Sequence, residues 1–279
     1  MQVVRTVAEF REARRRLPAP VGFFPTLGYM HEGHISLVER ARRECASVVA
    51  SIFVNPTQFG PNEDFSRYPR DEARDLAMLE GAGVDLVILP SVEEMYPAGD
   101  VTRVRVPGLS EVLEGKRRPG HFEGVTTVVA KLFGITEADF AYFGQKDAQQ
   151  LLIIERMVRD LHMPVTVVRC PTVREADGLA CSSRNVYLSP EERAQAVALW
   201  AGLRAAEAAC GAGERDTDRL RAVCREQIEA RPLASIDYLS LADEQTLEEL
   251  HGLVERPALM SLMVSFGNTH LIDNITLHP

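Results

Sequence analysis

The sequence predicts an α/β fold, with a mainly parallel sheet in an N-terminal domain and a smaller α+β domain after it. Between residues 21 and 169, short apolar runs alternate with helical patterns, which is typical of βαβ units. After about Val173 the pattern changes to helical stretches followed by strands. The length of 279 residues also favours about two domains. We therefore expect domains at residues 1–175 and 176–279.

The elements are predicted from local signals. Residues 48–54 form a run rich in β-branched side chains, and Pro90 ends the strand at 85–89. Gly81 is expected to end the helix that starts at Asp71. The predicted strands of the first domain are residues 21–24, 48–54, 85–89, 140–143 and 165–169, with helices at 35–44, 71–81 and 147–161. The second domain is predicted to contain helices at 191–209 and 217–230 and strands at 235–241, 258–266 and 269–277.

Charge, cysteine content and the length of apolar runs exclude several classes of protein. The chain has 31 basic and 40 acidic residues, a net charge of −9, so nucleic acid is an unexpected partner. Its five cysteines include no CxxC pair, which argues against a disulfide framework or a zinc ribbon and suits a reducing cytosol. The N-terminus lacks the apolar region of a secretory signal, and no apolar run approaches the ~20 residues that span a bilayer. We expect a cytoplasmic protein without a membrane partner.

The first motif, PTLGYMHEGH at residues 25–34, lies between a predicted strand and a predicted helix. N–H groups at a helix start and the helix dipole favour an anion there, and Gly28 and Gly33 allow close backbone approach. His31 and His34 are three residues apart, so both can face one phosphate. The histidines could instead form a surface pair, or bind zinc with a third ligand that the sequence does not place.

Two further motifs follow predicted strands. In residues 55–62, Asn55 and Gln58 offer amides that donate and accept where substrate loops lie, although the segment also has the composition of a simple turn. In residues 143–150, Lys146 is one of only three lysines and suits a phosphate, and Gln150 is one turn further on. Asp147 is either a helix N-cap or a metal or ribose ligand.

The fourth motif, at residues 174–185, has two serines and Arg184 in succession, which suit phosphate oxygens. The alternative is a polar exposed loop between domains, and a loop at such a junction is also well placed to close over a ligand. His121 falls in a segment expected to be a mobile loop, and we give it no role. His251, His270 and His278 are scattered and suit core or surface positions.

Residues 25–34, 52–59, 144–150 and 171–185, in this order, resemble the pantothenate synthetases (pantoate–β-alanine ligases), a family of the His-x-Gly-His nucleotidyltransferase superfamily. The resemblance implies a Rossmann-like N-terminal domain, a smaller C-terminal lid and a homodimer. It implies a ligase that uses ATP with Mg²⁺ to convert pantoate into pantoyl adenylate, which β-alanine then converts into pantothenate, with release of AMP and pyrophosphate. No protein-bound metal is implied.

Carried over by motif, the resemblance implies a role for each matched residue. The catalytic set is His34, His31, Lys146 and Arg184. The ATP-binding set is Leu27, Gly28, Tyr29, Met30, His31, Glu32, Gly33, His34, Gly144, Gln145, Lys146, Asp147, Val173, Cys181, Ser182, Ser183 and Arg184. Gln58 and Gln150 are implied to bind pantoate, Gln58 also β-alanine, and Asn55 lies with them in the substrate set.

The chain departs from the family's usual residues at Leu27, Tyr29, Met30, Gln145, Ala148 and Cys181, which bears on packing around adenine and not on the reaction class. Other functions remain open at this point. An adenylyltransferase would keep the nucleotide in its product, a metal-dependent hydrolase would hold zinc on His31 and His34, and a nucleotide-binding regulator would bind ATP without turnover. The net charge disfavours a tRNA-linked ligase.

Overall fold

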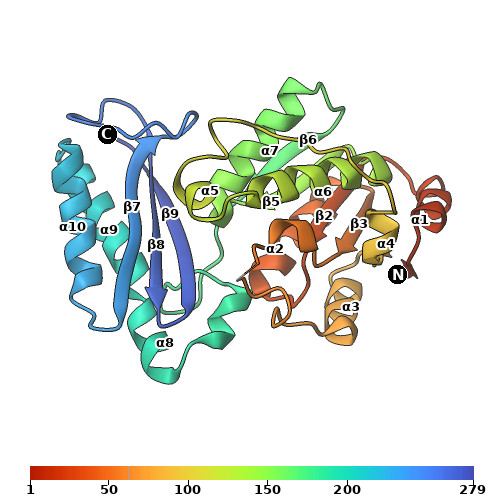
Figure 1. Ribbon diagram of the computed structural model, residues 1–279, viewed down its shortest axis with the longest axis horizontal. Coiled ribbons are helices and arrows are strands. Elements are labelled where there is room, and N and C mark those ends of the chain that lie inside the picture. Colours follow the sequence, from red (N-terminus) through yellow and green to blue (C-terminus); the bar gives the residue numbers. More distant parts are fainter. Residues whose placement is uncertain (62) are drawn as a thin grey trace. The chain divides into compact units, whose positions relative to one another are not determined.

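The computed structural model describes residues 1–61 and 63–279, and its chain forms two compact units. Unit 1 comprises residues 1–111, 115–145 and 150–171, and unit 2 comprises residues 112–114, 146–149 and 172–279. Figure 1 labels the elements of both units. Each unit is described by itself.

Unit 1 is built on a parallel sheet of six strands in the order β1-β4-β3-β2-β5-β6. Its strands are β1 (Gln2–Val4), β2 (Val21–Thr26), β3 (Ser47–Ile52), β4 (Leu86–Ile88), β5 (Phe140–Gly144) and β6 (Thr166–Cys170). Its helical elements are α1 (Val7–Arg14), α2 (Glu32–Glu44), η1 (Pro56–Gln58), α3 (Glu72–Gly81), α4 (Val92–Met95) and α6 (His121–Thr136). Three others, α5 (Leu113–Arg117), η2 (Gln145–Asp147) and α7 (Ala148–Asp160), have residues in both units. The parallel sheet predicted for the N-terminal part is thus confirmed.

Both faces of this sheet are covered, as a parallel sheet requires. In β2, Phe24 packs with Val38 and Ala41 of α2 on one face. Because successive side chains of a strand alternate, Phe23 points to the other face, where its ring lies 6.3 Å from that of Phe133 in α6. Helices α2 and α6 therefore sandwich the central strands and fix where the loops after those strands begin (Figure 1).

The central strand β2 lies between β3, the next strand along the chain, and β5, which follows two long excursions. The strand order therefore reverses direction at β2, and in open parallel sheets ligands bind beyond the carboxyl ends of the strands at such a point. The segments that follow β2, β3 and β5 contain the first three motifs of the sequence.

Unit 2 contains a three-stranded antiparallel sheet in the order β7-β8-β9. Its elements are η3 (Ser183–Tyr187), α8 (Pro190–Ala196), α9 (Ala198–Gly211), α10 (Thr217–Glu229), β7 (Ala234–Asp243), β8 (Ala258–Phe266) and β9 (Thr269–Leu277). Alternate residues of β8, such as Met260 and Leu262, pack with Leu203 of α9 and Cys224 of α10 in one core. The smaller α+β part predicted for the C-terminal region is also confirmed.

Several local expectations were wrong. His121 is not in a mobile loop: it is the first residue of α6, a 16-residue helix that the sequence reading did not assign, and its side chain is buried. The helical stretch 191–209 is divided into α8 and α9 at Val197. Helix α3 does end at Gly81, as predicted, but Gly81 is its last helical residue, and the left-handed residue after it is Gly83, with φ of +84°. As a separate finding, none of the helices within residues 1–61 and 63–279 has the length and apolar character that a membrane span needs.

Candidate active site

The loop after β2 is held by side chains that accept hydrogen bonds from its backbone N–H groups. The buried carboxylate of Asp75, 1% exposed, accepts the N–H of Tyr29 and the N–H of Met30, both at 2.7 Å. The N–H of Gly28 donates to the hydroxyl of Thr26 at 3.0 Å. Gly28 has φ of +93°, and a Cβ there would lie 2.9 Å from the Asp75 carboxylate. These bonds fix the loop through the N–H groups of Gly28, Tyr29 and Met30, which precede the first residue of α2.

His31 and His34 come together at the start of α2. Their ring centroids lie 4.0 Å apart at an interplanar angle of 31°. The backbone N–H of His31 donates to Nδ1 of His34 at 3.3 Å, so Nδ1 acts as an acceptor and the ring proton is placed on Nε2. Glu32 and Gly33 occupy the first turn of α2, where N–H groups have no partner within the helix. Two imidazoles and these N–H groups are the donors that this loop offers to an anion.

Asn55 and Gln58, which follow β3, are buried rather than part of an exposed turn. The side-chain oxygen of Asn55 accepts the N–H and hydroxyl of Thr57, at 3.3 and 2.9 Å, and the hydroxyl of Tyr96 at 2.9 Å. Its Nδ2 donates to Oε1 of Gln58 and to the carbonyl of Gly124, both at 3.1 Å. Asn55 therefore orients the amide of Gln58.

Sequence reasoning missed Asp75, Tyr96 and His121. Burial raises the pKa of Tyr96, so its hydroxyl stays protonated and able to donate at neutral pH. Asp75 and Tyr96 lie 46 and 41 residues from the groups that they contact, and no local pattern links such positions. The available signal was the position of Asp75 one helical turn before Leu79, which places an acid on the apolar side of α3. Asn62, the last residue of the second motif, lies outside the described residues.

The motif after β5 is divided between the units. Gly144 and Gln145 belong to unit 1, as does half-buried Gln150 of α7. In unit 2, Nζ of Lys146 lies 3.9 Å from a carboxylate oxygen of Asp147. These two residues help to line a hollow of about 20 Å³ within unit 2, room for about one water molecule.

The fourth motif forms a short hairpin in unit 2. Arg174 and Ala180 form an isolated β-bridge, and the N–H of Cys181 donates to the carbonyl of Val173 at 3.0 Å. The hydroxyl of Ser182 caps η3 by accepting the N–H of Arg184 at 3.3 Å. Cys181, Ser182, Ser183 and Arg184 are therefore presented in sequence at the start of a helical turn.

Charged groups anchor this hairpin. Arg174 makes two bonds, of 2.6 and 2.9 Å, to the carboxylate of Asp273, which is 1% exposed at its side chain, and lies 3.5 Å from the ring of Trp200. Arg193 of α8 pairs with Glu175 at 2.6 Å and with Asp177 at 2.8 Å. The hydrogen bond from Arg193 lowers the pKa of Asp177 below its ordinary value.

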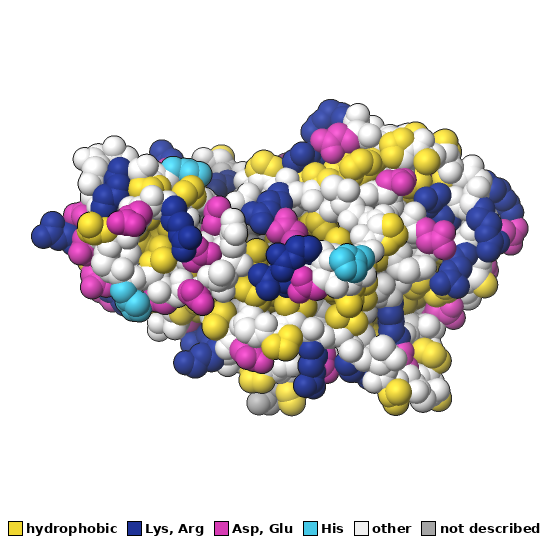
Figure 2. Space-filling model, turned by 90° about the horizontal axis from the view of Figure 1, so that it is seen from above, with side chains coloured by type: hydrophobic (Ala, Val, Ile, Leu, Met, Phe, Trp, Pro, Cys, Tyr) yellow, Lys and Arg dark blue, Asp and Glu magenta, His cyan; other side chains and the backbone are white. Residues whose placement is uncertain are grey.

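All five cysteines are free and buried, and burial raises the pKa of Cys224 to about 12. Within residues 1–61 and 63–279 there is no group of three or more His, Cys, Asp or Glu side chains suited to a metal ion. On the face drawn in Figure 2, Lys and Arg side chains lie among Asp and Glu side chains, so local donors rather than a broad basic field would attract an anion there.

The family model for pantoate-beta-alanine ligase matches residues 2–276. The chain belongs to this family. The resemblance found in the four motifs is thereby confirmed, and the chain is an enzyme of the ligase class. Among curated members of the pantoate–β-alanine ligase family, the pantothenate synthetase of Chloroflexus aggregans is 59% identical over 274 residues, 98% of this chain and 99% of the relative. That of Herpetosiphon aurantiacus is 56% identical over 277 residues, 99% of this chain and 100% of the relative.

Solved structures of the family share the fold. The pantothenate synthetase of Thermus thermophilus has a TM-score of 0.95 and 52% identity, with each chain covered in full. The pantoate-beta-alanine ligase of Francisella tularensis, solved as a complex with beta-gamma ATP and beta-alanine, has a TM-score of 0.80 and 33% identity over 99% of this chain and 97% of the other.

Proposed function

We propose that this chain joins pantoate to β-alanine in two steps at the expense of ATP. A carboxylate oxygen of pantoate attacks the α-phosphorus, a new O–P bond forms, and pyrophosphate leaves as the bond to the bridging oxygen breaks. The amine of β-alanine then attacks the acyl carbon, forming the C–N bond, breaking the C–O bond to AMP and releasing a proton. The single observation that carries this proposal is the match of residues 2–276 to the ligase family.

His34 serves in this proposal as a hydrogen-bond donor to the phosphates. Its Nδ1 accepts the N–H of His31, so a neutral ring offers its proton at Nε2. The first step brings two anions together, and donors aimed at the phosphate oxygens stabilise the added charge. His31, whose ring lies 4.0 Å away, would act beside it. This role needs no proton transfer from His34.

The ATP-binding set keeps the residues that the motifs imply, namely Leu27–His34, Gly144–Asp147, Val173 and Cys181–Arg184. The N–H groups of Tyr29 and Met30 donate to Asp75, so the imidazoles and the first-turn N–H groups of Glu32 and Gly33 are the donors of the first loop. Lys146 and Arg184 would add positive charge from unit 2.

Mg²⁺ would arrive on the triphosphate. This ion keeps several waters and binds through phosphates with one or two carboxylates, so it needs no dedicated protein cage. The described residues contain no group of three or more possible ligands, which suits an ion delivered by the nucleotide. Asp147 is the acidic residue within the motifs that could contact it.

Gln58 and Gln150 would bind pantoate, and Gln58 also β-alanine, with Asn55 completing the substrate set by orienting Gln58. Oε1 of Gln58 accepts from Asn55, which leaves its Nε2 to donate toward a substrate oxygen. Carboxylate and hydroxyl oxygens of pantoate are suitable acceptors. We further propose that residues 176–279 form a lid on a catalytic domain of residues 1–175, that the enzyme is a homodimer, and that it works in the cytoplasm, where its five free thiols would stay reduced.

Nucleotide product analysis tests the proposal. Purified protein is incubated with ATP, Mg²⁺ and pantoate, with and without β-alanine, and the products are resolved by chromatography. We expect AMP to rise strongly with β-alanine and to match pantothenate in amount. A nucleotide retained in the product would indicate an adenylyltransferase instead, and ATP binding with no AMP in either sample would indicate a regulator. Both results would overturn the proposal.

A further inference from the structure

His121 lies outside the four motifs, yet it contacts a residue of the substrate set. It is the first residue of α6, and it is 7% exposed. Its Nδ1 lies 2.8 Å from the backbone carbonyl oxygen of Gln58, and its Nε2 lies 3.0 Å from Nη1 of Arg118. All three residues belong to unit 1. A buried imidazole with a polar partner at each nitrogen has a defined protonation state.

The two partners determine that state. An arginine guanidinium has only donors, so Nε2 of His121 must accept from Arg118. A carbonyl oxygen only accepts, so Nδ1 carries the proton and donates it to Gln58. His121 is therefore the neutral Nδ1–H tautomer, since a second proton on Nε2 would face the guanidinium.

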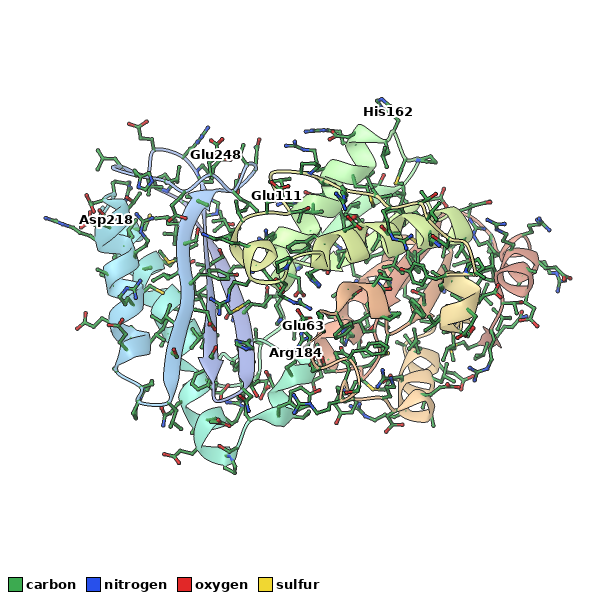
Figure 3. All side chains as sticks on the ribbon, in the orientation of Figure 1. Glu63, Glu111, His162, Arg184, Asp218 and Glu248 are labelled. Atoms are coloured by element: carbon green, nitrogen blue, oxygen red, sulfur yellow. The ribbon has the colours of Figure 1, made fainter. Side chains whose placement is uncertain are left out.

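The carboxylate of Glu63 holds Arg118 beside His121. Glu63 accepts from Nε and Nη2 of Arg118 at 2.8 and 2.5 Å. Burial alone would raise the pKa of Glu63, but the bonds and charge of Arg118 outweigh it, so the pKa lies below its ordinary value. Nη2 of Arg118 also lies 3.3 Å from the Gln58 carbonyl oxygen. Figure 3 labels Glu63 on the segment between η1 and α3.

The side-chain amide of Gln58 also has a defined orientation, which its contact with Asn55 determines. Asn55 receives the backbone N–H of Thr57 at its oxygen and donates to the backbone carbonyl of Gly124 from its nitrogen, so its amide has one orientation. The atom of Gln58 that faces Nδ2 of Asn55 must then be the acceptor Oε1. Within the described residues, Nε2 of Gln58 donates to no protein group, and it is the one polar end left for a ligand.

Close packing explains why these contacts form. A Cβ on Gly124 of α6 would lie 2.4 Å from the carbonyl oxygen of Thr57 and 2.6 Å from the amide nitrogen of Gln58. Only a glycine lets η1 approach the first turn of α6 this closely. The approach brings the backbone of Gln58 within reach of the His121 ring.

We propose that His121, held as the Nδ1–H tautomer by Arg118, is a positioning residue that fixes the backbone of Gln58 so that its Nε2 meets a substrate oxygen. This inference rests on the proposed role of Gln58 in binding pantoate. His121 acts through Gln58 and does not itself touch the substrate. Its loss should weaken the use of pantoate and leave ATP binding unchanged.

The test compares His121→Ala, His121→Asn and His121→Gln by steady-state kinetics, with binding of a non-hydrolysable ATP analogue measured by calorimetry. The amide of Asn reaches the position of Nδ1 and can still donate to the Gln58 carbonyl, whereas the longer Gln places its amide beyond it. We expect His121→Ala and His121→Gln to raise KM for pantoate about tenfold, or about 1.4 kcal/mol. His121→Asn should stay within about threefold of the parent, or about 0.65 kcal/mol.

Two controls separate positioning from general damage. His162→Asn makes the same change at an exposed histidine after α7, which points outward in Figure 3, and Asn tolerates its φ of +50°. It should leave every parameter unchanged. His121→Ala on a Gln58→Ala background should add no further increase in the pantoate KM, because the residue that it positions is already truncated.

The outcomes are distinguishable. If Gln58→Ala is itself silent, the assignment of Gln58 as a substrate residue fails and the role of His121 fails with it. If Gln58→Ala impairs pantoate use while His121→Ala and His121→Gln do not, only the present inference fails. Equal loss of ATP and pantoate binding in all three His121 variants would show a structural role and also overturn it. Should His121→Ala not fold, the contrast between Asn and Gln alone decides.

Discussion

The loop after β2 and the hairpin at residues 174–185 both carry proposed ATP-binding residues, but they are held in different ways. In the first, Tyr29 and Met30 donate backbone N–H groups to a carboxylate that is 1% exposed. In the second, Arg193 pairs with Glu175 and Asp177, whose side chains are 37% and 45% exposed. Buried bonds resist salt and solvent, whereas exposed ion pairs contribute little and are screened.

This difference suggests different tasks. The His31–His34 loop has a fixed geometry before a ligand arrives, which the proposed stabilisation of developing charge requires. The hairpin is fixed at its base by the pair of Arg174 with buried Asp273, while its tip depends on weaker surface pairs. A tip of this kind can adjust its position at low energetic cost, and it contains the segment proposed to close over the phosphates.

The largest effect is expected from His34→Ala. Loss of one preorganised donor to the reacting phosphate typically lowers turnover by 10²–10³, so we expect adenylate formation to fall about 500-fold with the fold intact. Single-turnover formation of pyrophosphate would measure it, and thermal unfolding would check the fold. Arg184→Ala, in the adjustable hairpin, should cost much less in the same step. Equal losses in the two variants would contradict the difference drawn between the loop after β2 and the hairpin. Near-normal turnover in His34→Ala would reject the catalytic role of His34.

Removing Asp75 should have the next largest effect. Asp75→Ala leaves the half-buried N–H of Tyr29 and the buried N–H of Met30 without this acceptor, at about 1–3 kcal/mol for a fully buried donor and less for a half-buried one. We expect a loss of about 3 kcal/mol in the free energy of unfolding, measured with urea, together with weaker ATP binding. Asp71→Ala is the matched control, because Asp71 caps the same helix and its loss should cost about 1 kcal/mol without affecting ATP. If Asp75→Ala bound ATP normally, the fixed loop would not matter for the nucleotide.

Most strands and helices could be predicted from the sequence because local patterns of residues indicate them. Runs of β-branched residues marked the strands, and the spacing of His31 and His34 at a helix start predicted that both lie on one side, where their rings are 4.0 Å apart. Helix α6 lacked such a signal. It reads HFEGVTTVVAKLFGIT, is rich in β-branched residues and is buried on most of its surface, so no polar face reveals a helical period. Tertiary packing rather than intrinsic propensity makes it a helix.

Tertiary contacts also explain why the sequence did not reveal the residues that hold the site. Asp75 and His121 act on residues 46 and 63 positions away, and only the fold brings them together. The motifs named the groups proposed to meet the ligands, but not the groups that hold them. The N–H groups of Tyr29 and Met30, which precede α2, donate to Asp75, and no local pattern indicated that contact.

Gln58→Ala should have a smaller and selective effect. It removes the Nε2 donor and leaves the histidine loop untouched, so KM for pantoate and for β-alanine should rise about tenfold, or about 1.4 kcal/mol, with ATP affinity unchanged. Initial rates at varied substrate, with calorimetry of an ATP analogue, would measure both. Gln195→Ala serves as a control, since that amide accepts the N–H of Leu233 in unit 2. An effect on ATP alone would contradict the role given to Gln58.

The smallest effect concerns the ion pairs at the hairpin tip. Arg193 lowers the pKa of Asp177, so the pair stabilises the folded state at pH values above the ordinary Asp pKa, and this contribution is lost as the pH falls through the lowered value. Because Asp177 is 45% exposed, we expect Arg193→Gln to reduce the free energy of unfolding by only about 0.5 kcal/mol at pH 7. The difference between variant and parent should shrink near pH 3 and in 1 M NaCl.

Arg225→Gln provides the matched control, because Arg225 pairs with Glu229 along the exposed surface of α10. Both variants should change global stability slightly, but only Arg193→Gln should speed amide hydrogen exchange at residues 174–185. That exchange should not change in Asp75→Ala, whose effect belongs to the other loop. Salt-independent exchange at the hairpin would mean that its tip is as firmly built as the loop after β2, and that both proposed phosphate-binding segments are preorganised before ATP binds.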